Sequence, residues 1–267
     1  MRLLLYYATI AMMLITLSSC EYRSGQERNP EGLGKTIWDI AYLDIVRVNE
    51  VLDFVAHYNY YLSIEEEAKS KVYLEKHLIE DGTMPKIKIN GNRHILTYNT
   101  TYGTTYDVEI EMFCDYWHVI RTGGRGYDIT IREGQEADYS VDIARLYSRE
   151  SVGSGQLEVN LNYTKIEYAS YVTEGIPEIE FTGNIVMVDS EASSEKPLIV
   201  TTNITSPLRF NNEQYYAHPV QGKMTITVED RLYGTIDEIE ASIVEMSLRY
   251  GVHVECLGTI RGYYFDN

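Results

Sequence analysis

Imidazole groups can bind a metal or transfer a proton near neutral pH, so the histidines are considered first. The chain has six: His57, His77, His94, His118, His218 and His253. None belongs to an HxH, an HExxH or another pair at metal-ligand spacing, so the sequence predicts no metal site. It also lacks a GxSxG nucleophile motif, and we expect Gly153-Ser154-Gly155 in a turn between strands.

Carboxylates are the most numerous ionisable groups, with 40 Asp and Glu residues. A glycosidase needs two carboxylates facing a cleft, but the spacing along this chain selects no pair. The chain has no Asp-x-Asp-x-Asp-Gly loop for calcium. We therefore expect no catalytic residue and no cofactor, and we expect that the protein is not an enzyme.

Tyrosine is frequent, with 24 residues beside five Phe and two Trp. Tyrosine favours strands and tolerates half-buried positions, so most of these rings are expected to serve packing. Tyrosine rings beside amides and carboxylates are also suited to binding sugars or peptides. The polar stretch Asn211–Tyr216 combines these groups, and we select Asn212, Tyr215 and Tyr216 as candidate ligand contacts.

The first twenty residues predict export. Arg2 supplies a positive charge, residues 3–17 are mainly apolar, and two small residues, Ser18 and Ser19, precede Cys20. This is the three-part layout of a secretory signal peptide. The apolar stretch is short for a helix that must cross roughly 30 Å of hydrocarbon, and no basic stop-transfer cluster follows it, which favours a cleaved signal.

Leu17-Ser18-Ser19-Cys20 closely resembles the lipobox of bacterial lipoproteins. The resemblance covers the signal alone, and it implies cleavage before Cys20, a diacylglyceryl group on the Cys20 sulfur and an acyl chain such as palmitate on the new amino group. Several acyl chains anchor a protein stably. We expect a lipid-anchored protein of the cell envelope, in the outer membrane, on its periplasmic or surface face. The tyrosine and asparagine content is similar to that of gut Bacteroidota lipoproteins.

The formal net charge of −17 argues against nucleic acid as a partner, because an acidic surface repels phosphate backbones. Two further cysteines, Cys114 and Cys256, each lie on the apolar side of a strand-like alternation. They could form a disulfide in an oxidising compartment or remain buried thiols. We favour buried thiols, because a free cysteine packs like a small hydrophobic residue.

The composition divides the chain into a signal peptide (1–19), a lipidated tether rich in Ser, Gly, Asn and Pro (20–34) and one domain (35–267). Within the domain, residues 36–80 have helical periodicity and 86–267 are mainly β. An amphipathic helix is predicted from Thr36, with its apolar stripe reaching Tyr58. Ser63 and Glu66 fit a capping box, which predicts a second helix from Ile64 to about Glu80.

From Lys86 the apolar period changes from 3.6 residues to 2, and Asn90-Gly91-Asn92 predicts a hairpin turn. The expected strands are 86–89, 95–98, 104–114, 117–121, 127–132, 138–147, 156–168, 178–188, 198–205, 223–229 and 252–260. Thr235–Tyr250 fits both periods, and we favour a helix there. The segments that link successive expected strands are too short for parallel crossovers, so they predict an antiparallel meander.

The predicted fold is therefore α+β, with the N-terminal helices packed on a long antiparallel β-meander that forms a curved sheet or a partly open barrel. This order resembles that of periplasmic lipoprotein carriers and lipid-binding lipoproteins, which implies an apolar cavity lined by Val108, Ile110 and Met112. We expect a membrane-anchored, non-enzymatic binding or structural domain. The alternatives are a hydrophobic-ligand carrier and a surface glycan-binding module, with a glycan, a lipid or a protein as candidate ligand; a hydrolase is the least favoured.

Overall fold

The structure is a computed structural model, and most of the chain beyond residue 29 can be described. The described residues are 30–77, 85–99, 105–122, 126–135, 138–147, 151–168, 171–189, 198–211, 218–230, 235–246 and 249–265. The predicted signal peptide, Cys20 and the candidate contacts Asn212, Tyr215 and Tyr216 lie outside these ranges. The predicted end of the second helix, near Glu80, also lies outside them.

Two helices open the described chain: α2 (Pro30–Ser63) and α3 (Glu67–His77). Helix α2 begins at Pro30, so the prediction that residues 30–34 belong to the tether is wrong. Proline is well tolerated in a first helical turn, where its missing N–H would have no partner in any case. The predicted capping box is also wrong. The Ser63 hydroxyl donates to the Tyr60 carbonyl inside α2, and the Glu66 carbonyl accepts the first helical N–H of α3, from Ser70.

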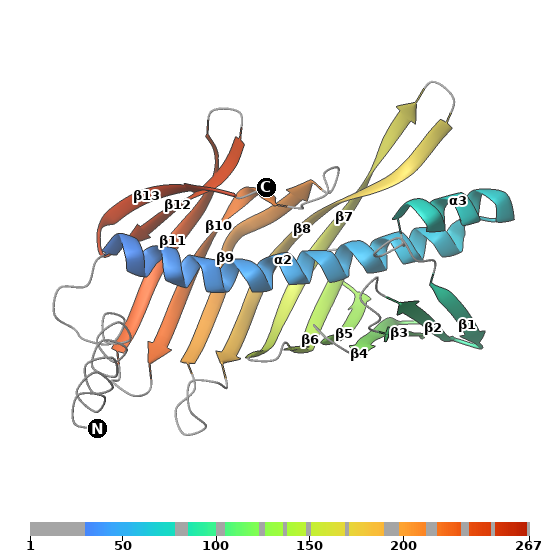
Figure 1. The fold of residues 1–267 in the computed structure, drawn as a ribbon, viewed down its shortest axis with the longest axis horizontal. Coiled ribbons are helices and arrows are strands. Elements are labelled where there is room, and N and C mark those ends of the chain that lie inside the picture. Colours follow the sequence, from blue (N-terminus) through green and yellow to red (C-terminus); the bar gives the residue numbers. More distant parts are fainter. Residues whose placement is uncertain are drawn as a thin grey trace, which may run out of the picture.

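Thirteen antiparallel strands form one sheet in which each strand pairs with the next along the chain (Figure 1). They are β1 (Lys86–Asn90), β2 (Arg93–Asn99), β3 (Thr105–Met112), β4 (Tyr116–Thr122), β5 (Gly126–Glu133), β6 (Tyr139–Tyr147), β7 (Ser151–Tyr168), β8 (Tyr171–Asp189), β9 (Leu198–Asn211), β10 (Pro219–Asp230), β11 (Thr235–Met246), β12 (Arg249–Cys256) and β13 (Thr259–Tyr264). The predicted antiparallel meander is thus confirmed, and β1 and β13 are the two ends of the strand order.

Three local predictions differ from the structure. The helix favoured at 235–250 is wrong, because Thr235–Met246 is strand β11, whose Ile239 faces Ile226 of β10 and Cys256 of β12. Gly153-Ser154-Gly155 lies inside strand β7 rather than in a turn. The strand predicted over 252–260 is interrupted by a two-residue turn, at which Leu257 and Gly258 both have positive φ.

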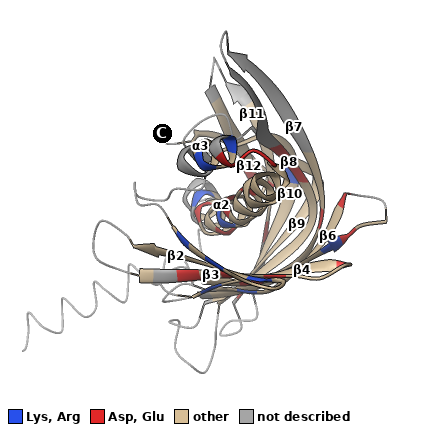
Figure 2. Cartoon of the chain, turned by 90° about the vertical axis from the view of Figure 1, so that its right-hand side faces the viewer, with Lys and Arg blue, Asp and Glu red and all other residues tan. Residues whose placement is uncertain are grey.

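Helix α2 lies in the concave side of the curved sheet (Figure 2). Its apolar residues belong to the same buried core as the inward side chains of the strands. Among the described side chains from Leu33 to Glu50, the exposed ones follow a narrow line along one side of the helix: Lys35, Asp39, Leu43 and Glu50. Of the two predicted helices, α2 alone packs on the sheet; α3 packs on α2, where the His57 ring and the Tyr73 hydroxyl are 2.6 Å apart.

Bulges in neighbouring strand pairings help the sheet to bend around α2. The register shifts once in the pairings of β5 with β6, β6 with β7, β7 with β8 and β8 with β9, and at three places between β9 and β10. Gly183 lies at the shift between β8 and β9 with a φ of 125°, and Gly222 lies among those between β9 and β10 with a φ of 135°. A bulge bends its strand and increases the local twist, so adjacent bulges curve several strands together.

Candidate ligand-binding site

A pocket of about 530 Å³ lies between α2 and the part of the sheet from the β3–β4 turn to β7. Its volume falls within the roughly 300–1,000 Å³ of typical small-molecule sites. The closest backbone approaches of α2 are to strands β8–β13. The helix therefore stands further from β4–β7, and the pocket occupies part of that gap.

One face of α2 forms the first wall of the pocket. Leu52, Val55, Ala56 and Asn59 line it, and their spacing of three, four and seven residues places them on one side of the helix. The first three are buried and Asn59 is exposed. The helix therefore presents an apolar surface to the interior of the pocket and an amide near its opening.

Inward side chains of β5, β6 and β7 form the second wall. The register places Ile131 opposite Val141, and Tyr139 opposite Val159, while Leu161 follows two residues later on β7. Alternate residues of a strand share a face, so the period of two that predicted these strands also directs these side chains toward α2. The wall is aliphatic except for the ring of Tyr139.

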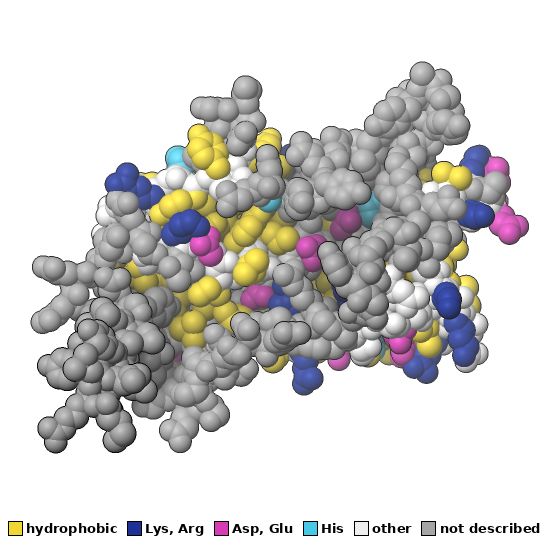
Figure 3. Space-filling view, in the orientation of Figure 1, with side chains coloured by type: hydrophobic (Ala, Val, Ile, Leu, Met, Phe, Trp, Pro, Cys, Tyr) yellow, Lys and Arg dark blue, Asp and Glu magenta, His cyan; other side chains and the backbone are white. Residues whose placement is uncertain are grey.

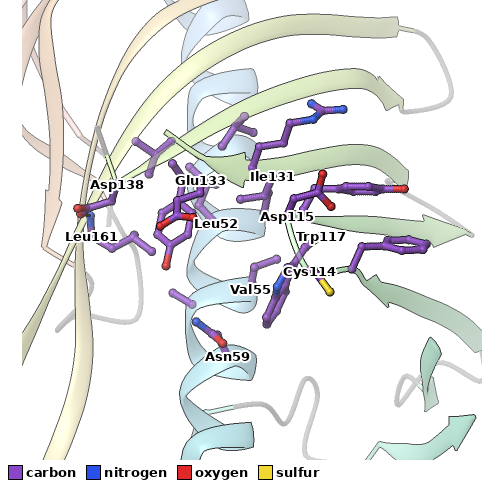
Figure 4. A pocket seen from close by; sticks show the side chains of 17 residues that line it. Leu52, Val55, Asn59, Cys114, Asp115, Trp117, Ile131, Glu133, Asp138 and Leu161 are labelled. Carbon is purple, nitrogen blue, oxygen red and sulfur yellow. Dashed lines mark hydrogen bonds between the residues drawn. The ribbon is translucent and has the colours of Figure 1, made fainter. Parts of the chain in front are cut away.

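Aromatic side chains surround the β3–β4 turn at the opening. The Phe113 N–H donates to the Tyr116 carbonyl at 2.9 Å, and the two rings stack with centroids 4.5 Å apart. The Arg132 guanidinium lies over the Tyr116 ring, 5.6 Å from its centroid. Trp117, the next residue, is half-buried and lines the pocket (Figure 4). Phe113 is 40% exposed, so the opening carries an accessible aromatic surface.

Charged groups at the opening are mainly acidic. Asp115, Glu133 and Asp138 line the pocket beside one guanidinium, that of Arg132, and all four residues are exposed. The Asp138 carboxylate accepts the Leu161 N–H at 2.7 Å and thereby ties the start of β6 to β7. Burial, with smaller contributions from the negative charges of Asp138 and Glu133, raises the pKa of Tyr139. Its phenol therefore stays neutral at physiological pH and can donate a hydrogen bond.

Cys256 was correctly predicted to be buried, but Cys114 was not. Cys114 and Cys256 form no disulfide with each other; Cys256 is buried under α2 and Cys114 is exposed beside the pocket. The strand-like alternation through Cys114 ends at Met112, where β3 stops. A cysteine in the following turn has no sheet neighbour to cover it.

The predicted cavity over Val108, Ile110 and Met112 is also not where the sequence placed it. Val108 and Ile110 are buried in the common core, and Met112 packs against that core. None of the three lines the pocket. On β2, the inward side chain of His94 instead contacts α2, where the Tyr58 hydroxyl and Nδ1 of His94 share a hydrogen bond of 2.7 Å.

Four of the histidines take part in packing or hydrogen bonding, and His253 of β12 is exposed. His57 and His94 contact Tyr73 and Tyr58, His218 contacts Tyr42, and Nε2 of His118 lies 2.8 Å from a carboxylate oxygen of Asp128. In the described parts of the chain, no three His, Cys, Asp or Glu side chains are grouped as metal ligands.

Sequence reasoning did not identify the pocket residues. Trp117 and Tyr139 occur in regular alternation like many other inward residues, and the three carboxylates occupy separate segments. The apolar face of α2 that includes Leu52 and Val55 was a partial signal, because it indicated that this side of the helix is buried. It did not indicate which part of that side faces the pocket.

Over the residues that can be described, no helix is both long and apolar enough to cross a membrane. Figure 3 shows hydrophobic side chains interspersed with charged ones on the face of the molecule that carries α2. No family model matches the chain, and neither curated proteins nor solved structures give a significant match.

Proposed function

We propose that this protein is a lipid-anchored protein of the bacterial cell envelope whose folded domain binds an amphipathic small molecule without catalysing a reaction. The pocket between α2 and strands β4–β7 is the observation that carries this proposal. It combines an aliphatic interior with aromatic and charged groups at the opening, as small-molecule sites generally do.

In this proposal the sheet acts as a partly open barrel, and α2 is a fixed plug inside it. The plug fills the concave side: Ile37 and Ile45 of α2 and Ile110 of β3 are all fully buried. A ligand therefore enters beside the helix rather than replacing it. This differs from a carrier with an empty barrel, because the ligand cavity is restricted to the β4–β7 side.

Burial of apolar surface supplies most of the expected affinity. At about 0.8 kcal/mol for each buried methylene, an eight-carbon chain gains roughly 6 kcal/mol before the loss of translational and rotational freedom is subtracted. With that loss at about 4 kcal/mol, the expected dissociation constant for such a chain alone is on the order of tens of millimolar. A natural ligand that also fills the polar opening should bind more tightly.

Binding can be measured through tryptophan fluorescence, because Trp117 lines the pocket and Trp38, the other tryptophan, is buried in the core. The full mature chain with Cys20→Ser, exported behind an ordinary signal peptide, would carry Trp38→Phe. Titration with short-chain amphiphiles below their micelle concentration should change the Trp117 emission and saturate.

Two substitutions on α2 form a matched pair for this assay. Asn59 and Glu50 are both exposed, and only Asn59 lines the pocket. Asn59→Phe should weaken binding at least about tenfold by occupying the opening, whereas Glu50→Phe should leave it unchanged. Equal effects of the two, or no saturable binding in the parent chain, would contradict the proposed site.

The anchor requires a separate measurement. Mass spectrometry of the native amino terminus should show Cys20 as the first residue, carrying a diacylglyceryl group and an acyl chain. An unmodified amino terminus with residues 1–19 still attached would overturn the proposed anchoring, and it would not affect the binding measurement.

A further inference from the structure

The acidic groups at the pocket come together only through folding. Asp115 lies in the β3–β4 turn, Glu133 ends β5, and Asp138 precedes β6. Figure 4 shows Asp115 and Asp138 on opposite sides of the pocket with Glu133 between them. Carboxylates from three separate segments thus surround one opening whose interior is apolar. A ligand head group held there is within the field of all three.

Among the described residues that line the pocket, one has a cationic side chain, and it is already directed toward a ring. The Arg132 guanidinium lies over the face of Tyr116. A second charge, Asp138, is held by the Leu161 N–H and remains at the edge of the pocket. An anionic head group would therefore meet a surplus of negative charge, with one guanidinium in competition for it.

The rings at the opening favour a cation for a second reason. Phe113, Tyr116, Trp117 and Tyr139 all line the pocket, and the face of an aromatic ring attracts a positive charge. Rings combined with carboxylates are the groups that bind organic ammonium ions in proteins. The aliphatic side chains of Leu52, Val55 and Val141 lie next to them and suit a hydrocarbon tail.

We infer that the ligand of this pocket is an amphipathic organic cation, with its tail between α2 and strands β5–β7 and its ammonium-type head among Asp115, Glu133 and the aromatic side chains. The inference rests on the proposed binding function and adds the charge of the ligand. Attraction of cations by the overall charge of −17 is the effect from which it must be separated.

The test compares ligands with one tail and opposite heads. Octyltrimethylammonium and octyl sulfate, both below their micelle concentrations and in about 150 mM salt, would be titrated into the Cys20→Ser, Trp38→Phe mature chain. Tetramethylammonium would measure the head group alone. We expect octyltrimethylammonium to bind about tenfold more tightly than octyl sulfate, and tetramethylammonium to bind far more weakly than either, since it lacks the tail.

Paired variants locate the charge effect. The double substitution Asp115→Asn with Glu133→Gln should weaken octyltrimethylammonium binding about threefold to tenfold and should not weaken octyl sulfate binding. Glu238→Gln with Glu240→Gln removes two exposed carboxylates from β11, outside the pocket, and should change neither. All four side chains are exposed, and equal thermal unfolding temperatures would verify that each variant is folded.

The outcomes separate the two proposals. If neither octyl ligand binds, the proposed binding function fails and the inference fails with it. If octyl sulfate binds as tightly as octyltrimethylammonium or more tightly, the binding function stands and the inferred ligand charge is wrong. If both double variants weaken the cation equally, general charge attraction explains the preference, and this also overturns the inference.

Discussion

Replacing Gly183 by Ala tests the physical account of the bend that encloses α2. Gly183 has a φ of 125°, a backbone conformation that is almost exclusive to glycine. A Cβ atom there would overlap the Gln156 carbonyl oxygen and would lie 2.9 Å from the Leu157 Cα. Both neighbours belong to the backbone of β7, so no side-chain rotation can relieve the overlap, and β7 and β8 would have to separate.

Gly91 provides a matched control for this substitution. It also has positive φ, at 65°, but a Cβ atom there would meet nothing within 4 Å. Gly91→Ala should therefore lower the free energy of unfolding only by the cost of the left-handed conformation, about 1 kcal/mol. Gly183→Ala adds an overlap inside a packed sheet, commonly worth about 1–3 kcal/mol, for a total of about 2–4 kcal/mol.

Urea denaturation of the lipid-free mature chain, followed by circular dichroism, measures both changes. The predicted difference of about 2 kcal/mol corresponds to roughly 4–8 °C in melting temperature for a chain of this size. If Gly183→Ala destabilises the protein no more than Gly91→Ala does, the close approach of β7 and β8 at the bulge is not a real constraint, and the explanation of the bend fails.

Three further measurements address the core, a titration and the thiols. Ile45→Ala should lower the free energy of unfolding by about 2–5 kcal/mol, because Ile45 is fully buried. Leu43→Ala should change it by less than about 0.5 kcal/mol, because the Leu43 side chain is 57% exposed. Urea denaturation measures both changes. Burial lowers the pKa of His94, and its hydrogen bond with the backbone at residue 91 opposes this by a smaller amount. The unfolded chain therefore binds the proton more strongly than the folded chain does. The stability of the protein should consequently fall as the pH drops below about 6.5. The melting temperature of a His94→Gln variant should fall less between pH 7.5 and 5.5; an equal fall would show that this histidine does not contribute. A thiol reagent followed by peptide mass spectrometry should modify Cys114 in the native protein and Cys256 only after unfolding, and early modification of Cys256 would contradict its burial under α2.

The strands could be predicted because their signals are local. Alternation with a period of two, interrupted by turns such as Asn90-Gly91, is complete within each hairpin. The segment 235–246 shows where local signals fail. Ile239 and Ile243 fit a helical and an extended period equally. The segment forms a strand because β10 and β12 pair with it on both sides. Hydrogen-bond partners from other parts of the chain cannot be read from the segment itself.

The start of α2 shows how composition can mislead. Gly34 was assigned to a tether because Gly, Pro, Asn and Ser are frequent in linkers. In the structure it is a buried helical residue, and a Cβ atom there would lie 3.1 Å from Cys256 Cβ and 3.2 Å from Val254 Cγ1. The glycine lets α2 approach β12 closely, so a residue typical of linkers has a packing role that only the partner strand reveals.

The pocket could not have been predicted from alternation, because the same pattern leads to two different environments. Ile110 of β3 and Ile131 of β5 both face inward, yet Ile110 is completely covered and Ile131 lines the pocket. The environment of Ile131 depends on the path of α2, which approaches β8–β13 closely and leaves space beside β4–β7. The close packing of Gly34 on β12 contributes to that path. An alanine at position 34 would require this end of α2 or its neighbours on β12 to shift by a few tenths of an ångström.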